Sequence, residues 1–262
     1  MMLKDKVAVV YGAGGDIGGA VARAFAREGA KLFLSGRTLR KVEAVAADII
    51  GRRGVAEAAQ VDALDEQAVE KYVDAVAETA GTIDICFNAI SIARPVPKLP
   101  LLELSAEDFA LPITTYAQSN FLTARSAARR MVAKRAGVIL TITGTPGRMG
   151  FTNVGGTGAG YAAVVALTRA LSAELGPQGV RVVGLMPNAI PESALIRESF
   201  ARYAKAAGVT PAEFQARFES MTHLRRLTTL EELANVAVFL ASDKAGGMTG
   251  TIANLSGGGV VD

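Results

Sequence analysis

The stretch VVYGAGGDIGGAVA, residues 9–22, decides the fold. A short run of β-branched residues ends at Tyr11, and apolar residues recur at helical spacing from Asp16 onward. Four glycines stand between and around them: Gly12, Gly14, Gly15 and Gly18. A strand, a glycine turn and a helix in this order predict a dinucleotide-binding unit, in which backbone N–H groups and the helix N-terminus face a pyrophosphate.

Strand-like and helix-like segments alternate along the rest of the chain. Further strands are expected at 31–36, 55–62, 83–88, 137–143, 180–187 and 250–258. Helices are expected at 16–30, 38–54, about 65–80, about 106–134, 157–175 and 229–242, with irregular helical pieces before the last of these. Apolar strands alternating with helices predict a parallel sheet covered on both faces, in an α/β, doubly wound Rossmann fold forming one domain over 1–262.

Composition excludes several classes of protein. Half of the 262 residues are hydrophobic, the formal net charge is +3, and basic and acidic residues interleave, so no nucleic-acid partner is expected. The N-terminal apolar run is too short for a membrane span or a signal sequence. One cysteine, Cys86, and one histidine argue against a His/Cys metal site, and we expect a reduced, cytoplasmic protein with a buried thiol.

The end of the second strand bears on the choice of dinucleotide. A carboxylate there would hold a ribose 2′-hydroxyl, but the strand ends in FLSGRT, with Gly36 in the place of the acid and Arg37 next. An arginine pairs well with a 2′-phosphate, which favours NADP(H) over NAD(H). The alternative is that Arg37 is simply a solvated residue at a helix start.

Six segments of the chain, in order and at the right separations, resemble the short-chain dehydrogenase/reductase family. These are the glycine turn, VDALD (61–65), IDICFNAIS (83–91), FLTARSAARRM (121–131), ALTRALSAELGPQGVRVVGLMP (166–187) and the C-terminal LEELANVAVFLASDKAGGMTGTIANLSGGG (230–259). The resemblance implies a seven-stranded parallel sheet in strand order 3-2-1-4-5-6-7 and a homotetramer or homodimer. Small residues along 155–166 would suit close packing between copies.

The resemblance also implies which residues bind the dinucleotide. Asp62 matches the residue that contacts adenine, and Asn88 matches the first Asn of the family's NNAG segment. The implied set is Gly12, Gly14, Gly15, Asp16, Ile17, Gly18, Arg37, Asp62, Asn88 and Tyr161. Asp16 replaces the middle glycine of the family turn. It is a favourable residue for a helix start, but close to a pyrophosphate its charge would repel.

The family's Asn, Ser, Tyr and Lys set is missing from this sequence. A gapless alignment backward from ALTRAL places Thr157 on the Tyr position and Tyr161 on the Lys position. The Ser position falls on Gly144 and the Asn position on Tyr116. The family's base needs a cation beside a phenol, because an ordinary tyrosine pKa of about 10 is too high at neutral pH.

Several polar residues remain near these positions as candidates for replacement chemistry. The candidate catalytic residues are Tyr161, Thr157, Tyr116 and Thr143, with Thr145 close by. Two tyrosines could hold or protonate a carbonyl oxygen, or they could simply pack at a helix interface. The one histidine, His223, could also exchange protons near neutral pH, although a lone histidine in a loop is more often exposed.

Three functions fit these observations. The first is an NADP(H)-dependent oxidoreductase that acts on a carbonyl or alcohol with a non-standard active site. The second is an inactive NADP(H)-binding sensor or scaffold, and the third is a redox-neutral dehydratase or isomerase on the same fold. The apolar, Ala-rich segment 187–222 suggests a small hydrophobic substrate, or only a helical lid.

Overall fold

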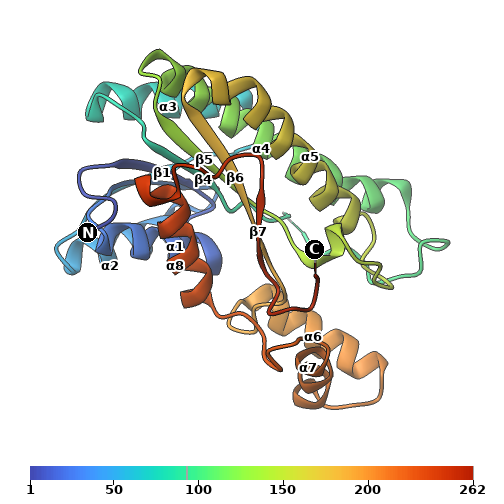
Figure 1. The fold of residues 1–262 in the computed structure, drawn as a ribbon. Coiled ribbons are helices and arrows are strands. Elements are labelled where there is room, and N and C mark those ends of the chain that lie inside the picture. The colour runs from blue at the N-terminus through green and yellow to red at the C-terminus, as the bar shows by residue number, and fades with distance from the viewer. Residues whose placement is uncertain (93, 262) are drawn as a thin grey trace.

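The computed structural model describes residues 1–92 and 94–261, and its centre is one parallel sheet (Figure 1). The seven strands follow the order β3-β2-β1-β4-β5-β6-β7, and each neighbouring pair is parallel. Their bounds are β1 Val7–Tyr11, β2 Lys31–Gly36, β3 Val55–Gln60, β4 Ile85–Asn88, β5 Gly137–Ile142, β6 Val180–Pro187 and β7 Ile252–Leu255. The predicted fold class and strand order are confirmed.

Helices cover both faces of the sheet. Their bounds are α1 Asp16–Arg27, α2 Leu39–Gly51, α3 Glu66–Ala80, α4 Ala106–Ala133, α5 Thr157–Leu175, α6 Ala194–Ala206, α7 Pro211–Ser220 and α8 Leu230–Ala241. Short 3-10 turns occupy Thr145–Gly147, Gly176–Gln178 and Asp243–Ala245. The irregular segment between β6 and α8 therefore contains two helices, α6 and α7, which lie together away from the main body of helices (Figure 1).

Alternation along the strands divides the core into two layers. In β1, Ala8 and Val10 face one layer with α1, α2 and α8, where Phe25 is fully buried. Val9 and Tyr11 face the other layer with α3 and α4. β1 is thus apolar and buried on both faces, as a strand between two helical layers requires.

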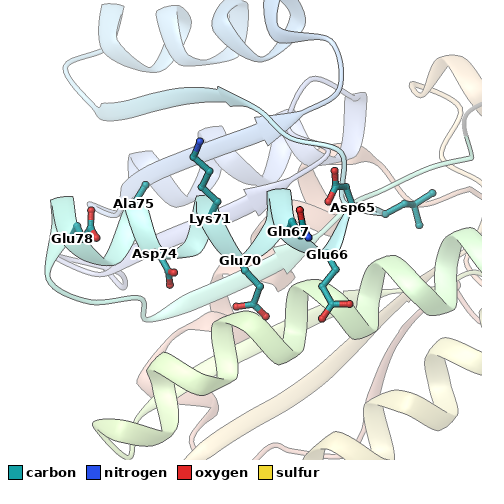
Figure 2. Close-up of a pocket in the computed structure, with 9 residues that line it drawn as sticks. Asp65, Glu66, Gln67, Glu70, Lys71, Asp74, Ala75 and Glu78 are labelled. Atoms are coloured by element: carbon teal, nitrogen blue, oxygen red, sulfur yellow. The ribbon is translucent and has the colours of Figure 1, made fainter.

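Ion pairs fix α3 against α4. Glu66, Glu70 and Asp74 point from α3 toward α4, along a shallow hollow on the α3 surface (Figure 2). There they pair with three arginines of α4, which are Arg125, Arg129 and Arg130. The acidic row is therefore neutralised within the chain. Among the described residues, no helix is long and apolar enough to cross a membrane.

The small residues at the start of α5 are explained by packing within the chain. A Cβ on Gly156 would overlap the carbonyl oxygen of Phe109 in α4, and one on Gly160 would lie 2.8 Å from that of Pro112. Side chains here would push the two helices apart. These glycines bring α5 onto α4 and so set the distance between the side chains further along both helices.

Candidate active site

The parallel sheet brings the segments that follow β1, β4, β5 and β6 to one edge. The carboxyl ends of parallel strands meet there, and ligands of open α/β sheets bind in the crevice outside them. The glycine turn follows β1, Asn88 ends β4, Gly144 follows β5, and α6 follows β6. The fold therefore gathers the predicted cofactor and reaction positions along one side of the molecule.

In the glycine turn, backbone segments pack directly against one another, with no room for side chains between them. Gly12 has φ +72°, and a Cβ there would lie 2.6 Å from the carbonyl oxygen of Ala89. A Cβ on Gly18 would overlap the carbonyl oxygen of Gly12. Gly15 caps α1 without a side-chain acceptor, so the first N–H groups of this helix stay available to an anion. The backbone of this turn fits the pyrophosphate of a dinucleotide.

The other predicted cofactor residues surround this turn. Asn88 is buried, with its amide donating to Thr123 Oγ1 at 3.0 Å and its oxygen accepting from the N–H of Ile90 at 2.9 Å. Asp62 is exposed after β3, and its carboxylate accepts from the N–H of Leu64. Arg37 is exposed after β2, and its guanidinium has no ion pair with any described residue. Ile17 is half-buried, and its side chain packs in part on the core layer that contains α1.

Tyr116 of α4 and Tyr161 of α5 form a stacked pair. Their ring centroids lie 4.9 Å apart with an interplanar angle of 17°. Each phenol affects the pKa of the other, and Ser91, in the segment after β4, affects that of Tyr116. Ala89 of the same segment packs against Gly12, so residues 89–91 lie between the tyrosine pair and the glycine turn.

Gly144 is shaped by this pair. A Cβ at this position would lie 2.8 Å from Cε2 of Tyr161, so any larger residue would meet the ring. The tyrosine thus takes the space that a serine side chain would occupy after β5. Position 144 can therefore hold only glycine as long as the Tyr161 ring occupies this space.

Burial raises the pKa of both tyrosines. For Tyr116 the main cause is desolvation, reinforced by Tyr161, and Ser91 opposes it. For Tyr161 desolvation again dominates, and the hydrogen bond from Tyr116 opposes it. Among the described residues, no lysine or arginine contributes to either shift. Both phenols are therefore protonated at neutral pH, which suits them to donate hydrogen bonds and makes them poor bases.

The remaining predicted residues near the tyrosine positions are three threonines, which follow β5 or begin α5. Thr143 is buried and its hydroxyl donates to the carbonyl oxygen of Leu185 in β6 at 3.3 Å, which engages it within the sheet. Thr145 donates to Asn188 Oδ1 at 3.3 Å. Thr157 opens α5 and is half-buried, one turn before Tyr161.

His223 belongs to a different surface. It is exposed and packs on Gly258, in a groove lined from α8, β7 and the end of the chain. Neither tyrosine of the pair lines that groove. Within the described residues, no group of three or more His, Cys, Asp or Glu side chains is placed to hold a metal ion.

An aromatic cluster joins α6, α7 and the loop before α5. Phe200 and Tyr203 of α6 pack on Phe214 and Phe218 of α7, and Phe218 stacks on Phe151 from the loop before α5. The Tyr203 hydroxyl also donates to the carbonyl oxygen of Asn153 at 3.1 Å. These contacts hold α6 and α7, which follow β6, against each other and against the loop after β5.

Two acidic residues accept hydrogen bonds that the sequence did not predict. The Asp16 carboxylate accepts from the backbone N–H of Ala194, the first residue of α6, at 2.7 Å. The Glu192 carboxylate accepts from the N–H of Leu230, the first residue of α8, at 2.6 Å. Both bonds join segments remote in the sequence, and no spacing pattern indicates them.

This fold and edge-of-sheet site define a Rossmann-type protein built to bind a dinucleotide. The sequence matches the profile of a family described as enoyl-(acyl carrier protein) reductase over residues 12–259. The chain belongs to the short-chain dehydrogenase/reductase family. It is 30% identical over 260 residues to the 7alpha-hydroxysteroid dehydrogenase of Escherichia coli (strain K12), covering 99% of this chain and 96% of that enzyme.

Solved structures agree with this placement. The sorbitol-6-phosphate 2-dehydrogenase of Erwinia amylovora superposes with a TM-score of 0.91 at 29% identity, covering 97% of this chain and all (100%) of that one. An NAD+-bound xylitol dehydrogenase gives a TM-score of 0.92 at 26% identity, with coverage of 98% and 100%. All three of these relatives are dehydrogenases.

Proposed function

We propose that this protein is an NADP(H)-dependent oxidoreductase that acts on the carbonyl or alcohol group of a small, apolar molecule. The observation that carries the proposal is the neutral tyrosine pair, held beside the segment that closes the glycine turn. Hydride transfer needs mainly a carbonyl carbon positioned against the nicotinamide, and the family relatives named above are oxidoreductases.

The preference for NADP(H) rests on the end of β2. Gly36 leaves no carboxylate there to repel a 2′-phosphate, and the Arg37 guanidinium, which forms no ion pair within the described residues, is available to bind one. Gly12, Gly15, Gly18 and the first N–H groups of α1 would hold the pyrophosphate.

The tyrosines would act on the substrate oxygen. When bound, the dihydronicotinamide supplies a hydride to the carbonyl carbon. One of the paired phenols donates a hydrogen bond to the carbonyl oxygen and passes its proton as that oxygen becomes an alkoxide, which is a stronger base than a phenolate. Because burial raises both pKa values, the pair favours reduction over alcohol oxidation at neutral pH.

The proposal also includes α6 and α7 as a lid over the substrate. Their aromatic residues, Phe200, Phe214 and Phe218, suit an apolar substrate. We also propose a homotetramer or homodimer, as the resemblance implies, and a cytoplasmic location.

A second candidate is an inactive NADP(H)-binding sensor or scaffold. The specific observation in its favour is that the Tyr161 ring fills the space beside Gly144 and stacks on the ring of Tyr116. Under this alternative the dinucleotide binds, and no carbonyl compound is reduced.

Replacing Tyr161 tests the proposed chemistry. We expect Tyr161→Phe to lower kcat for carbonyl reduction by about 100-fold or more, because a positioned proton donor contributes on that order. NADPH binding, followed by nicotinamide fluorescence, should persist. The matched control is Tyr72→Phe, which removes a buried hydroxyl from α3 and should leave turnover within about twofold. Unchanged turnover in Tyr161→Phe would remove this residue from the chemistry.

A further inference from the structure

Asp16 lies where two helices begin. It is the first residue of α1, and its carboxylate accepts from the N–H of Ala194, the first residue of α6, 178 positions away. The N-terminus of a helix carries a partial positive charge and unsatisfied N–H groups. One carboxylate therefore faces two positive helix ends.

Neither helix supplies another anion there. The first turn of α6 contains no acidic residue, and its N-cap, Ser193, reaches Ile196 through a bond of 3.4 Å. The N-cap of α1 is Gly15, which has no side chain to offer. Both first turns lie within the described residues, and Asp16 is the one acidic side chain in either of them.

This position is also the place for a pyrophosphate. The N–H groups of Asp16, Ile17 and Gly18 are the first three of α1 and lack acceptors within the helix. A dinucleotide bound to them would bring a second negative charge close to the Asp16 carboxylate. The glycine turn therefore fits a pyrophosphate through its backbone and opposes it through this one side chain.

We propose that Asp16 is a built-in anion of the nucleotide site, which docks helix α6 and sets a limit on dinucleotide affinity. The limit on affinity rests on the proposed function, while the docking of α6 does not. The carboxylate holds α6 against α1 through Ala194. It competes by charge with the phosphates that the same turn is shaped to receive.

Two substitutions separate the hydrogen bond from the charge. Asp16→Asn keeps an oxygen acceptor for Ala194 and removes the charge, whereas Asp16→Ala removes both. In the nucleotide-free protein, we expect amide hydrogen exchange in 194–206 to rise by about fivefold or more in Asp16→Ala and by less in Asp16→Asn. NADPH should bind both variants about tenfold more tightly than the unaltered protein, as measured by nicotinamide fluorescence.

Ser193→Ala is the matched control. It weakens the start of α6 from its own N-cap and leaves the glycine turn unchanged, so exchange in α6 should rise while NADPH affinity stays constant. Exchange in α6 that is equal in Asp16→Ala and in the unaltered protein would overturn the docking role. An unchanged NADPH affinity in Asp16→Asn would overturn the electrostatic role. If Asp16→Asn binds NADPH and the unaltered protein does not, the inference stands and the proposed function fails.

Discussion

At the scale of single residues, Gly144 and Tyr161 depend on each other. The ring of Tyr161 stacks on Tyr116 and lies where a side chain at position 144 would extend. A serine or a larger residue there would force the ring out of the stack, and α5 is held too closely to α4 to move aside. Gly144, Tyr116 and Tyr161 therefore form one packed group.

Gly144→Ser should destabilise the protein by about 1–3 kcal/mol, the usual cost of overpacking a tight contact. The physical reason is the 2.8 Å approach of its Cβ to Tyr161 Cε2. In a Tyr161→Ala background the same change should be nearly neutral, because the opposing ring is gone. Denaturant unfolding of the four proteins of this cycle measures the coupling. Equal costs in both backgrounds would show that the two residues are independent.

The sequence indicates which helices carry the two tyrosines, but not how their side chains pack. Thr157 and Tyr161 are four residues apart and so lie on one face of the helix predicted at 157–175, while Tyr116 lies in the helix predicted at about 106–134. The stacking angle and the crowding at Gly144 depend on how α4 approaches α5, which no local pattern encodes. The bond from the N–H at the start of α6 to the carboxylate at the start of α1 was likewise out of reach, because it spans 178 positions.

At the scale of elements, the start of α8 is stabilised by several acceptors at once. Thr229 and Glu232 form a capping box, Arg226 pairs with both oxygens of the Glu232 carboxylate at 2.9 and 2.5 Å, and Glu192 reaches Leu230. The hydrogen bonds from Arg226, followed by that from the Thr229 backbone, lower the pKa of Glu232 to about 2.

This shift predicts how stability changes with pH. The pKa of Glu232 lies at about 2 in the folded protein against an ordinary value of 4.5, so its contribution is complete above about pH 5 and is lost as pH falls toward 2. Glu232→Gln should lower the free energy of unfolding at pH 7 by about 1 kcal/mol or less, because the pair is partly exposed. The difference should shrink in acid. Glu231→Gln, in the same turn, is the control, and a pH-independent difference would argue against the Glu232 ion pair.

Regular elements were predictable where the pattern was long. The helix predicted at 157–175 and the strand at 180–187 have those bounds in the structure. The strand predicted from 83 begins at Ile85 instead, although the backbone of Asp84 already bonds to Val7 and Val138 on the neighbouring strands. The lid helices α6 and α7 were seen only as irregular pieces, because their apolar faces pack mainly on each other.

At the scale of the whole molecule, the chain has the family's seven-stranded fold. The strand order brings the glycine turn to the carboxyl edge of the sheet, and segment 89–91 packs against it there. The alternation of strands and helices was enough to predict this architecture. It could not predict the chemistry, because the same strands and helices can carry different side chains at the edge of the sheet.

The most direct measurement monitors the nicotinamide absorbance of NADPH, and of NADH in parallel, against a panel of apolar carbonyl compounds. We predict that the purified protein oxidises NADPH with at least one of them and prefers it to NADH, because Gly36 and Arg37 favour a 2′-phosphate. Binding of NADPH without any oxidation would favour the sensor. Failure to bind or oxidise either nucleotide would contradict the account.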